Sequence, residues 1–205
     1  MSTFIISSSA ITPMVSGVNG LASINLTLHL SFGQLLHSWS SSLTFTHILH
    51  SRYRSQEDLW EYVVHPKHVR VVNENKLIID DVMAVDWMFN GASVSPKPGS
   101  AMRVTFLKLK GNLGEHEKAR GLEVIGGIKD QFQAIEQLSL GENFSHEREK
   151  GFTIASIAVL PGQADLEALD SNSEGVNSHE EKVGDSIESV VIVDYLIPLP
   201  QVANL

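Results

Sequence analysis

The stretch that decides the fold is Asp80-Asp81-Val82-Met83-Ala84-Val85-Asp86-Trp87, because a related stretch, Glu188-Ser189-Val190-Val191-Ile192-Val193-Asp194-Tyr195, follows it later in the chain. Both are apolar, valine-containing runs typical of a strand, and both end in an aspartate and an aromatic residue. The same spacing separates Leu30-Ser31-Phe32-Gly33 from Leu138-Ser139-Leu140-Gly141. Nearly the same spacing separates two shorter pairs: Phe45-Thr46 from Phe152-Thr153, and Asp58-Leu59 from Asp165-Leu166. Matches in one order at a nearly constant spacing predict two copies of one module.

The length of the chain agrees with this reading. Its 205 residues allow two domains of about 100 residues, each with a modest core. We expect an irregular N-terminus over residues 1–13, a first module over 14–89, a linker over 90–100 and a second module over 101–198. The linker is rich in glycine, serine and proline, which favour turns.

The second copy has the clearer hydrophobic pattern. It predicts strands over 102–110, 134–141, 152–160 and 189–196, and helices over 114–131 and from 163 onward, continuing less regularly over 178–185. This order, β-α-β-β-α-β, is that of a ferredoxin-like module in the α+β class. The first copy predicts a helix after Thr12-Pro13, strands over 26–32, 43–50 and 82–88, and a helix capped by Ser55 and interrupted at His65-Pro66.

The first copy has no counterpart of the first strand. When the repeat spacing is subtracted from residue 102, where this strand is predicted to begin, the equivalent position falls before Met1. We therefore expect the first module to lack its first strand. Thr3-Phe4-Ile5-Ile6 is a weak substitute, and a start that truncates a longer chain is the alternative.

Composition excludes several classes of protein. A hydrophobic fraction of 42% and a charged fraction of 19% are those of a folded globular chain. Without cysteine there is no disulfide, thiolate metal site or thiol nucleophile. A net charge of -9 disfavours a nucleic-acid partner, and no apolar run is long enough for a membrane span.

A longer motif carries a family resemblance. Glu61-Tyr62-Val63-Val64-His65-Pro66-Lys67-His68-Val69, together with the strand that ends at Trp87, resembles the stress-response A/B barrel family, with its His-Pro-x-His helix and closing strand. Phe45-Thr46-His47 resembles the family's third strand and Val104–Lys110 its first. The resemblance covers residues 14–88 and 101–197 and looks like the two-module plant members. It implies two sheets that face each other as a barrel within one chain, with a homodimer of the whole chain as an alternative.

Four side chains form the candidate site. Tyr62 and His65, and likewise His65 and His68, lie three residues apart on one helical face. His47 shares strand parity with apolar neighbours, so it points to one face of the sheet. A buried histidine near a tyrosine can serve as a general acid or base, or bind a ligand.

The resemblance assigns roles to this constellation. The family contains a plant polyketide cyclase with a tyrosine–histidine pair, which matches Tyr62 and His68 as catalytic residues. We expect His47 and His65 to be ligand-binding residues. The second copy has no such site, because Leu169–Glu174 replaces the His-Pro-x-His segment, Ile154 the third-strand histidine and Arg103 the first-strand histidine. Some relatives hold magnesium through main-chain carbonyls, which match Leu21, Ile24 and Thr27; no cofactor is otherwise required.

Three functions follow as hypotheses. The first is a non-catalytic stress- or defence-response protein that binds a small apolar ligand. The second is a cyclase-like enzyme that uses Tyr62 and His68, and the third is a structural pseudo-dimer that recruits a protein partner. Ala203-Asn204-Leu205 is similar to a peroxisomal address, and no secretory signal precedes the first copy, so we expect a peroxisomal or cytoplasmic protein that is not secreted.

Overall fold

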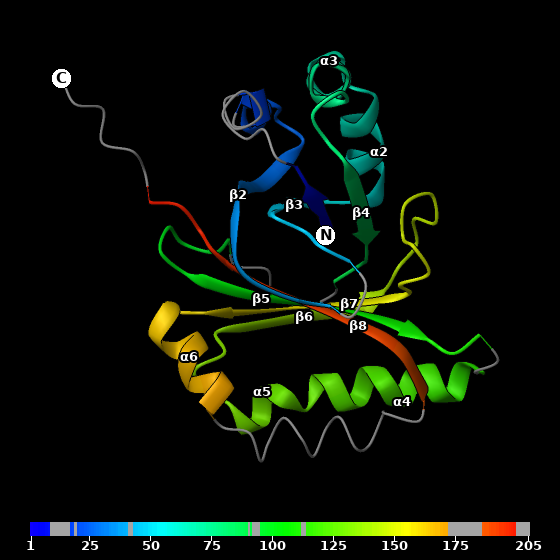
Figure 1. Cartoon of the computed structure of the whole chain (residues 1–205), viewed down its shortest axis with the longest axis vertical. Coiled ribbons are helices and arrows are strands. Elements are labelled where there is room, and N and C mark those ends of the chain that lie inside the picture. Colours follow the sequence, from blue (N-terminus) through cyan, green and yellow to red (C-terminus); the bar gives the residue numbers. More distant parts are fainter. Residues whose placement is uncertain are drawn as a thin grey trace.

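The two expected modules share one curved antiparallel sheet (Figure 1). The structure is a computed structural model that describes residues 1–8, 17–18, 20–40, 43–89, 91, 95–111, 114–171 and 186–199. The strands are β1 (Ser2–Ser7), β2 (Thr27–Ser40), β3 (His47–Tyr53), β4 (Asp81–Asp86), β5 (Ala101–Leu109), β6 (Gln137–Glu142), β7 (Ile154–Leu160) and β8 (Ile187–Leu196). The helices are η1 (Leu21–Ser23), α2 (Gln56–Val64), α3 (Pro66–Asn75), α4 (Glu115–Gly126), α5 (Ile128–Gln131) and α6 (Gln163–Ser171).

Strand order confirms the fold class. The sheet runs β4-β1-β3-β2-β8-β5-β7-β6, so each module contributes the same ferredoxin-like order of its fourth, first, third and second strands. Figure 1 shows α2 and α3 on one side of the strands and α4, α5 and α6 on the other, so the helices lie outside the paired sheets. Among the described residues, no helix is long and apolar enough to cross a bilayer.

The predicted absence of a first strand in the first module is wrong. Ser2–Ser7 forms β1, between β3 and β4, so residues 2–7 are not irregular either. Phe4 pairs with Ala84, and Thr105 pairs with Ile192. Phe4 and Thr105 are therefore equivalent, but they lie closer together in sequence than Ala84 and Ile192 do. The first module is shorter between its first two strands, and a constant spacing could not find the strand.

Two other expectations also need correction. The strand predicted over 26–32 extends to Ser40, because its second half pairs with the other module. The single helix predicted over 114–131 divides into α4 and α5 at Gly126-Gly127, where two adjacent glycines weaken a helix. The predicted helix start at Thr12-Pro13, the helical segment 178–185 and the tail Ala203-Asn204-Leu205 lie outside the described residues.

The modules meet at two seams. At the first seam, residues 35–40 of β2 pair with β8 in a ladder that begins at Leu35 and Tyr195. At the second seam, Trp87 and Asn143 form a single antiparallel bridge. The amide of Phe144 donates to the carbonyl oxygen of Asp86 at 2.9 Å beside this bridge. The two outer strands of the sheet, β4 and β6, are thereby joined, and the sheet closes into an intramolecular barrel.

Apolar side chains from both modules fill the barrel. The central cluster is Ile5, Phe45, Ile48, Met83, Val85, Trp87, Met102, Val104, Phe106, Phe152, Ala155, Ile157, Val159, Val191, Val193, Tyr195 and Ile197. Burial of this shared core holds the modules together, at roughly 25 cal/mol for each Å² of apolar surface removed from water. Separate clusters lie between the outer faces of the sheet and the helices of each module.

Candidate functional site

The helical break at Pro66 builds the centre of the candidate site. Proline has no N–H and fits the first turn of a helix, so α2 ends at Val64 and α3 begins at Pro66. The side chain of His65 caps α3, since its Nδ1 accepts the amide of Lys67 at 3.2 Å. The carbonyl oxygen of Val63 then lies within reach of the His68 side chain, 2.8 Å from Nδ1.

The tautomer of His68 follows from this contact. A carbonyl oxygen only accepts, so Nδ1 of His68 carries the proton and Nε2 presents a lone pair. Burial lowers the pKa of His68 most, and the charges of Arg148 and His65 lower it further, while the bond to Val63 raises it. The ring is therefore neutral at pH 7, with one fixed donor and one open acceptor.

Tyr62 and His68 come together, as the spacing predicts. Their ring centroids are 4.8 Å apart at an angle of 45°. Tyr62 is only 2% exposed and also packs against Tyr53, with centroids 5.2 Å apart. Burial raises the pKa of the Tyr62 hydroxyl to about 12, so it is a neutral group in this position.

Two further hydroxyls accompany Tyr62 and were not expected from the sequence. Ser51 and Tyr53 share the helix-facing side of β3, and their hydroxyls are buried beside that of Tyr62. Burial and the nearby Tyr62 raise the pKa of Tyr53. Alternation along β3 is the signal that could have grouped Ser51 with Tyr53.

A cleft of about 500 Å³ opens beside His68, on the outer face of the first module. Helices α2 and α3 form one wall, strands β1 and β4 the floor, and a segment of the second module the other wall. Its apolar lining residues are Phe4, Leu59, Trp60, Val63, Val69, Val72, Ala84 and Phe144. His68 lines this cleft, whereas Tyr62 lies behind it in the core beneath the helices.

His47 and His65 lie elsewhere in the first module. His47 is 1% exposed, and its ring is stacked on Phe32 with centroids 5.7 Å apart. Its Nδ1 lies 2.7 Å from the hydroxyl of Thr46, and burial lowers its pKa. Neither His47 nor His65 lines the cleft, so the predicted ligand-binding histidines do not join His68 in one pocket.

The carbonyls predicted for magnesium take part in a turn. The oxygen of Leu21 accepts the amide of Ile24 at 3.0 Å, and the oxygen of Ile24 accepts the amide of Thr27 at 3.2 Å. Across the described part of the chain, no three His, Asp or Glu side chains are grouped as metal ligands. A hard cation prefers several oxygens, including carboxylates, so this donor set fits magnesium poorly, and the metal stays a prediction.

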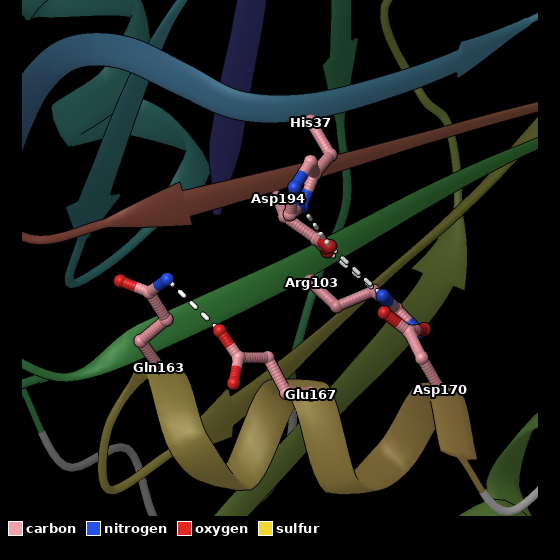
Figure 2. Close-up of polar contacts among 6 residues, drawn as sticks. All are labelled: His37, Arg103, Gln163, Glu167, Asp170 and Asp194. Atoms are coloured by element: carbon pink, nitrogen blue, oxygen red, sulfur yellow. Dashed lines mark hydrogen bonds and ion pairs between the residues drawn. The ribbon is translucent and has the colours of Figure 1, made fainter.

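The second module has an ion-pair network in place of a histidine site. Figure 2 shows Arg103 between Asp194 and Asp170, with distances of 2.8 Å to Asp194 and 2.6 Å to Asp170. His37, from β2, adds a third contact at 3.5 Å from Asp194. These residues come from β2, β5, α6 and β8, so the network ties the first seam together. Ile154 is fully buried, in agreement with a structural second module.

A polar group inside the barrel was also missed. His50 and Arg52 alternate along β3 onto the inner face, and Arg52 donates from Nε to Nε2 of His50 at 3.0 Å. Nδ1 of His50 therefore carries the proton and donates to the hydroxyl of Thr3 at 3.1 Å. Burial lowers the pKa of His50 well below its usual range, and that of His29 to about 4.

Fold and cleft together define a tandem ferredoxin-like barrel with one histidine-bearing cleft. Comparison with known families agrees: the stress responsive A/B barrel domain matches twice, over residues 6–89 and 102–197. The chain belongs to this family.

Two plant relatives are similar to the chain in sequence, and a solved structure is similar to it in fold. The chain is 45% identical over 194 residues to a stress-response A/B barrel domain-containing protein of Arabidopsis thaliana, covering 93% of this chain and 73% of that protein. It is 39% identical to a second protein of that description from the same plant, covering 94% of this chain and 90% of that protein. The crystal structure of an anthrone oxidase-like protein matches all of this chain and 95% of its own length, with a TM-score of 0.57. Its 10% sequence identity shows a likeness of fold alone.

Proposed function

We propose that the protein is a stress-response barrel that binds, without converting it, a small apolar molecule carrying one hydroxyl group. The ligand occupies the cleft of the first module, and its hydroxyl donates to Nε2 of His68. The observation that carries this proposal is the fixed tautomer of His68 among the apolar side chains of α2 and α3 at the cleft wall.

The size and lining of the cleft support the class of ligand. About 500 Å³ lies within the range of roughly 300–1,000 Å³ of small-molecule pockets. The wall formed by α2 and α3 is mainly apolar, the wall formed by residues 144–148 is mainly polar, and Trp60 remains 56% exposed. Exposed apolar surface of this kind in a concave site favours a ligand that is removed from water.

The state of His68 supports the hydroxyl group. A neutral imidazole whose Nδ1–H is already bonded to Val63 offers only an acceptor to a ligand. No hydrogen bond to Nε2 is formed by the described residues around it. A ligand hydroxyl satisfies this atom, whereas a carbonyl or ether oxygen leaves it without a donor.

A cyclase-like enzyme is the second candidate. The close approach of Tyr62 to His68 and the neutral, buried Tyr62 hydroxyl support it. In a cyclase mechanism His68 is the general base and Tyr62 holds a carbonyl group, so both side chains must reach the same substrate. Because Tyr62 is 2% exposed and does not line the cleft, binding without catalysis is the better-supported function.

Calorimetry with 4-butylphenol and its methyl ether, 4-butylanisole, tests the proposal. The ether keeps the shape but removes the donor, so we expect the phenol to bind about fivefold more tightly, for one hydrogen bond of about 1 kcal/mol. His68→Leu removes this preference. His146→Leu, a change at the exposed rim of the same cleft, keeps it. Equal affinities for the two compounds in the unaltered protein would overturn the proposal.

A further inference from the structure

A second cavity, of about 230 Å³, lies at the end of β3 and the start of α2. Leu59 and Phe144 line both this cavity and the cleft of the first module, and His68 lines only the cleft. The apolar part of its wall also contains Leu28, Met88 and Phe89. Its volume is below that of a pocket for a drug-sized ligand, so it fits a smaller molecule.

Two arginines give this cavity its chemistry. Arg52 is 2% exposed, and its contacts include hydrogen bonds to His50 at 3.0 Å and to Gln137 at 2.8 Å. Arg54 follows β3, and its Nη1 lies 3.3 Å from the carbonyl oxygen of Asn25 and 3.6 Å from the carboxylate of Asp58. A guanidinium held in position by its neighbours is suited to bind a carboxylate through two hydrogen bonds.

The other polar groups of the cavity wall also favour an anion. Ser55 and Gln56, at the beginning of α2, line the cavity, and the start of a helix carries partial positive charge. Ser55 accepts the amide of Asp58 at 3.2 Å. Among the described residues that line the cavity there is no Asp or Glu. The chain as a whole carries a net charge of -9, so this is a local positive site on an acidic protein.

The histidines beside Arg52 add no charge to the cavity at pH 7. His29 and His50 lie next to each other on the inner face, with ring centroids 5.7 Å apart. Burial and the charge of Arg52 lower the pKa of both, so they are neutral at pH 7. Burial lowers the pKa of Arg52 itself to about 10, which leaves it charged at pH 7.

We propose that this cavity is a separate binding site for a small organic acid. The carboxylate lies between Arg52 and Arg54, and the apolar body of the ligand packs on Leu28, Leu59 and Met88. The site is independent of the hydroxyl-binding cleft, because none of its charged residues lines that cleft.

Calorimetry of the full chain with 2-naphthoate and uncharged 2-naphthamide tests this site. We expect the acid to bind about tenfold more tightly than the amide, as charge-assisted hydrogen bonds exceed neutral ones. Arg54→Gln, an exposed change, lowers the affinity for the acid about fivefold and leaves that for the amide unchanged. Arg52→Gln abolishes the preference in protein that retains its cooperative thermal unfolding.

Three controls separate this site from other sources of anion binding. Arg148→Gln removes an exposed arginine of the neighbouring cleft and leaves 2-naphthoate binding unchanged. His68→Leu also leaves 2-naphthoate binding unchanged. Failure of one proposal is therefore distinguishable from failure of the other. Inorganic phosphate binds weakly and competes with 2-naphthoate, because it matches the arginines and lacks the apolar body. Equal affinities for acid and amide, full affinity after Arg54→Gln, or loss of affinity after Arg148→Gln would each overturn the proposal.

Discussion

The indole N–H of Trp87 donates to the hydroxyl of Ser139 at 2.8 Å, and both residues are fully buried. This bond joins the closing strand of the first module to the second strand of the second module. Tyr195 and Gly33 lie in contact at the other seam. Tyr195 is the repeat equivalent of Trp87, and Gly141 is the repeat equivalent of Gly33. The most similar parts of the repeat are therefore the parts that meet across the seams.

Gly33 allows the close approach at the first seam. A Cβ atom there would lie 2.9 Å from Cε2 of Tyr195, a ring that is fully buried. We expect Gly33→Ala to lower the free energy of unfolding by about 1–3 kcal/mol, as overpacking in a core does. Gly20→Ala is the matched control, since nothing lies within 4 Å of its Cβ position. Urea unfolding measures both, and equal effects of the two changes would contradict this account of the seam.

The ion pair behind the first seam is also open to test. Arg103 is 14% exposed in its side chain and bonds to both carboxylate oxygens of Asp194. Asp194→Asn removes the carboxylate partner of this largely buried guanidinium. We expect the free energy of unfolding to fall by about 3–5 kcal/mol. Asp170→Asn, at a side chain 45% exposed, costs about 1 kcal/mol or less. Equal losses in urea unfolding would show that burial does not set the strength of these contacts.

Stability depends on pH through the histidines of the barrel interior. The pKa of His29 is lowered from 6.5 to about 4 in the folded protein, and that of His50 is lowered further below its usual range. The unfolded chain therefore binds more protons below pH 6.5, and the folded state loses stability as the pH falls from 6.5 toward 4.

The expected slope is about 1.4 kcal/mol for each pH unit and each histidine that titrates only in the unfolded chain. His29→Gln removes one such group and makes the slope smaller by about that amount. His116→Gln, on the exposed face of α4, is the matched control. Urea unfolding at a series of pH values measures the slope, and identical slopes for all three proteins would refute the assignment to His29.

His65 has a structural role that substitution can isolate. Its Nδ1 caps α3 through the amide of Lys67. We expect His65→Ala to lower the free energy of unfolding by about 1 kcal/mol. His65→Asn should retain most of the original stability, because asparagine is a good N-cap residue. Thermal unfolding compares the three proteins. A stable His65→Ala protein with impaired binding of 4-butylphenol would instead give His65 a part in the ligand site.

Much of the fold could be predicted from the repeat, because strands and seams reuse the same motifs. The helical break was also predictable, since Pro66 imposes it locally. The first strand was missed because the first module is shorter before β2, which a fixed spacing cannot represent. The arginine-lined cavity was missed because Arg52 meets Gln137 only after two modules close into a barrel.

The cleft, too, could be predicted from the sequence only in part. The sequence places Tyr62 and His68 on neighbouring turns, and the structure confirms their contact. The far wall of the cleft comes from residues 144–148 of the second module. No local pattern connects those residues to α2 and α3, so the presence of His68 in the cleft wall, and of Tyr62 behind it, required the structure.

The imidazole nitrogen resonances of His68 test the central claim most directly. Long-range proton–nitrogen correlation spectra at pH 7.5 report which ring nitrogen carries the proton. We expect a protonated Nδ1 and a bare Nε2 in the free protein. With 4-butylphenol, only the Nε2 resonance moves, in the direction of a nitrogen that accepts a hydrogen bond. A protonated Nε2 in the free protein, or no change at Nε2 with saturating 4-butylphenol, would contradict the account.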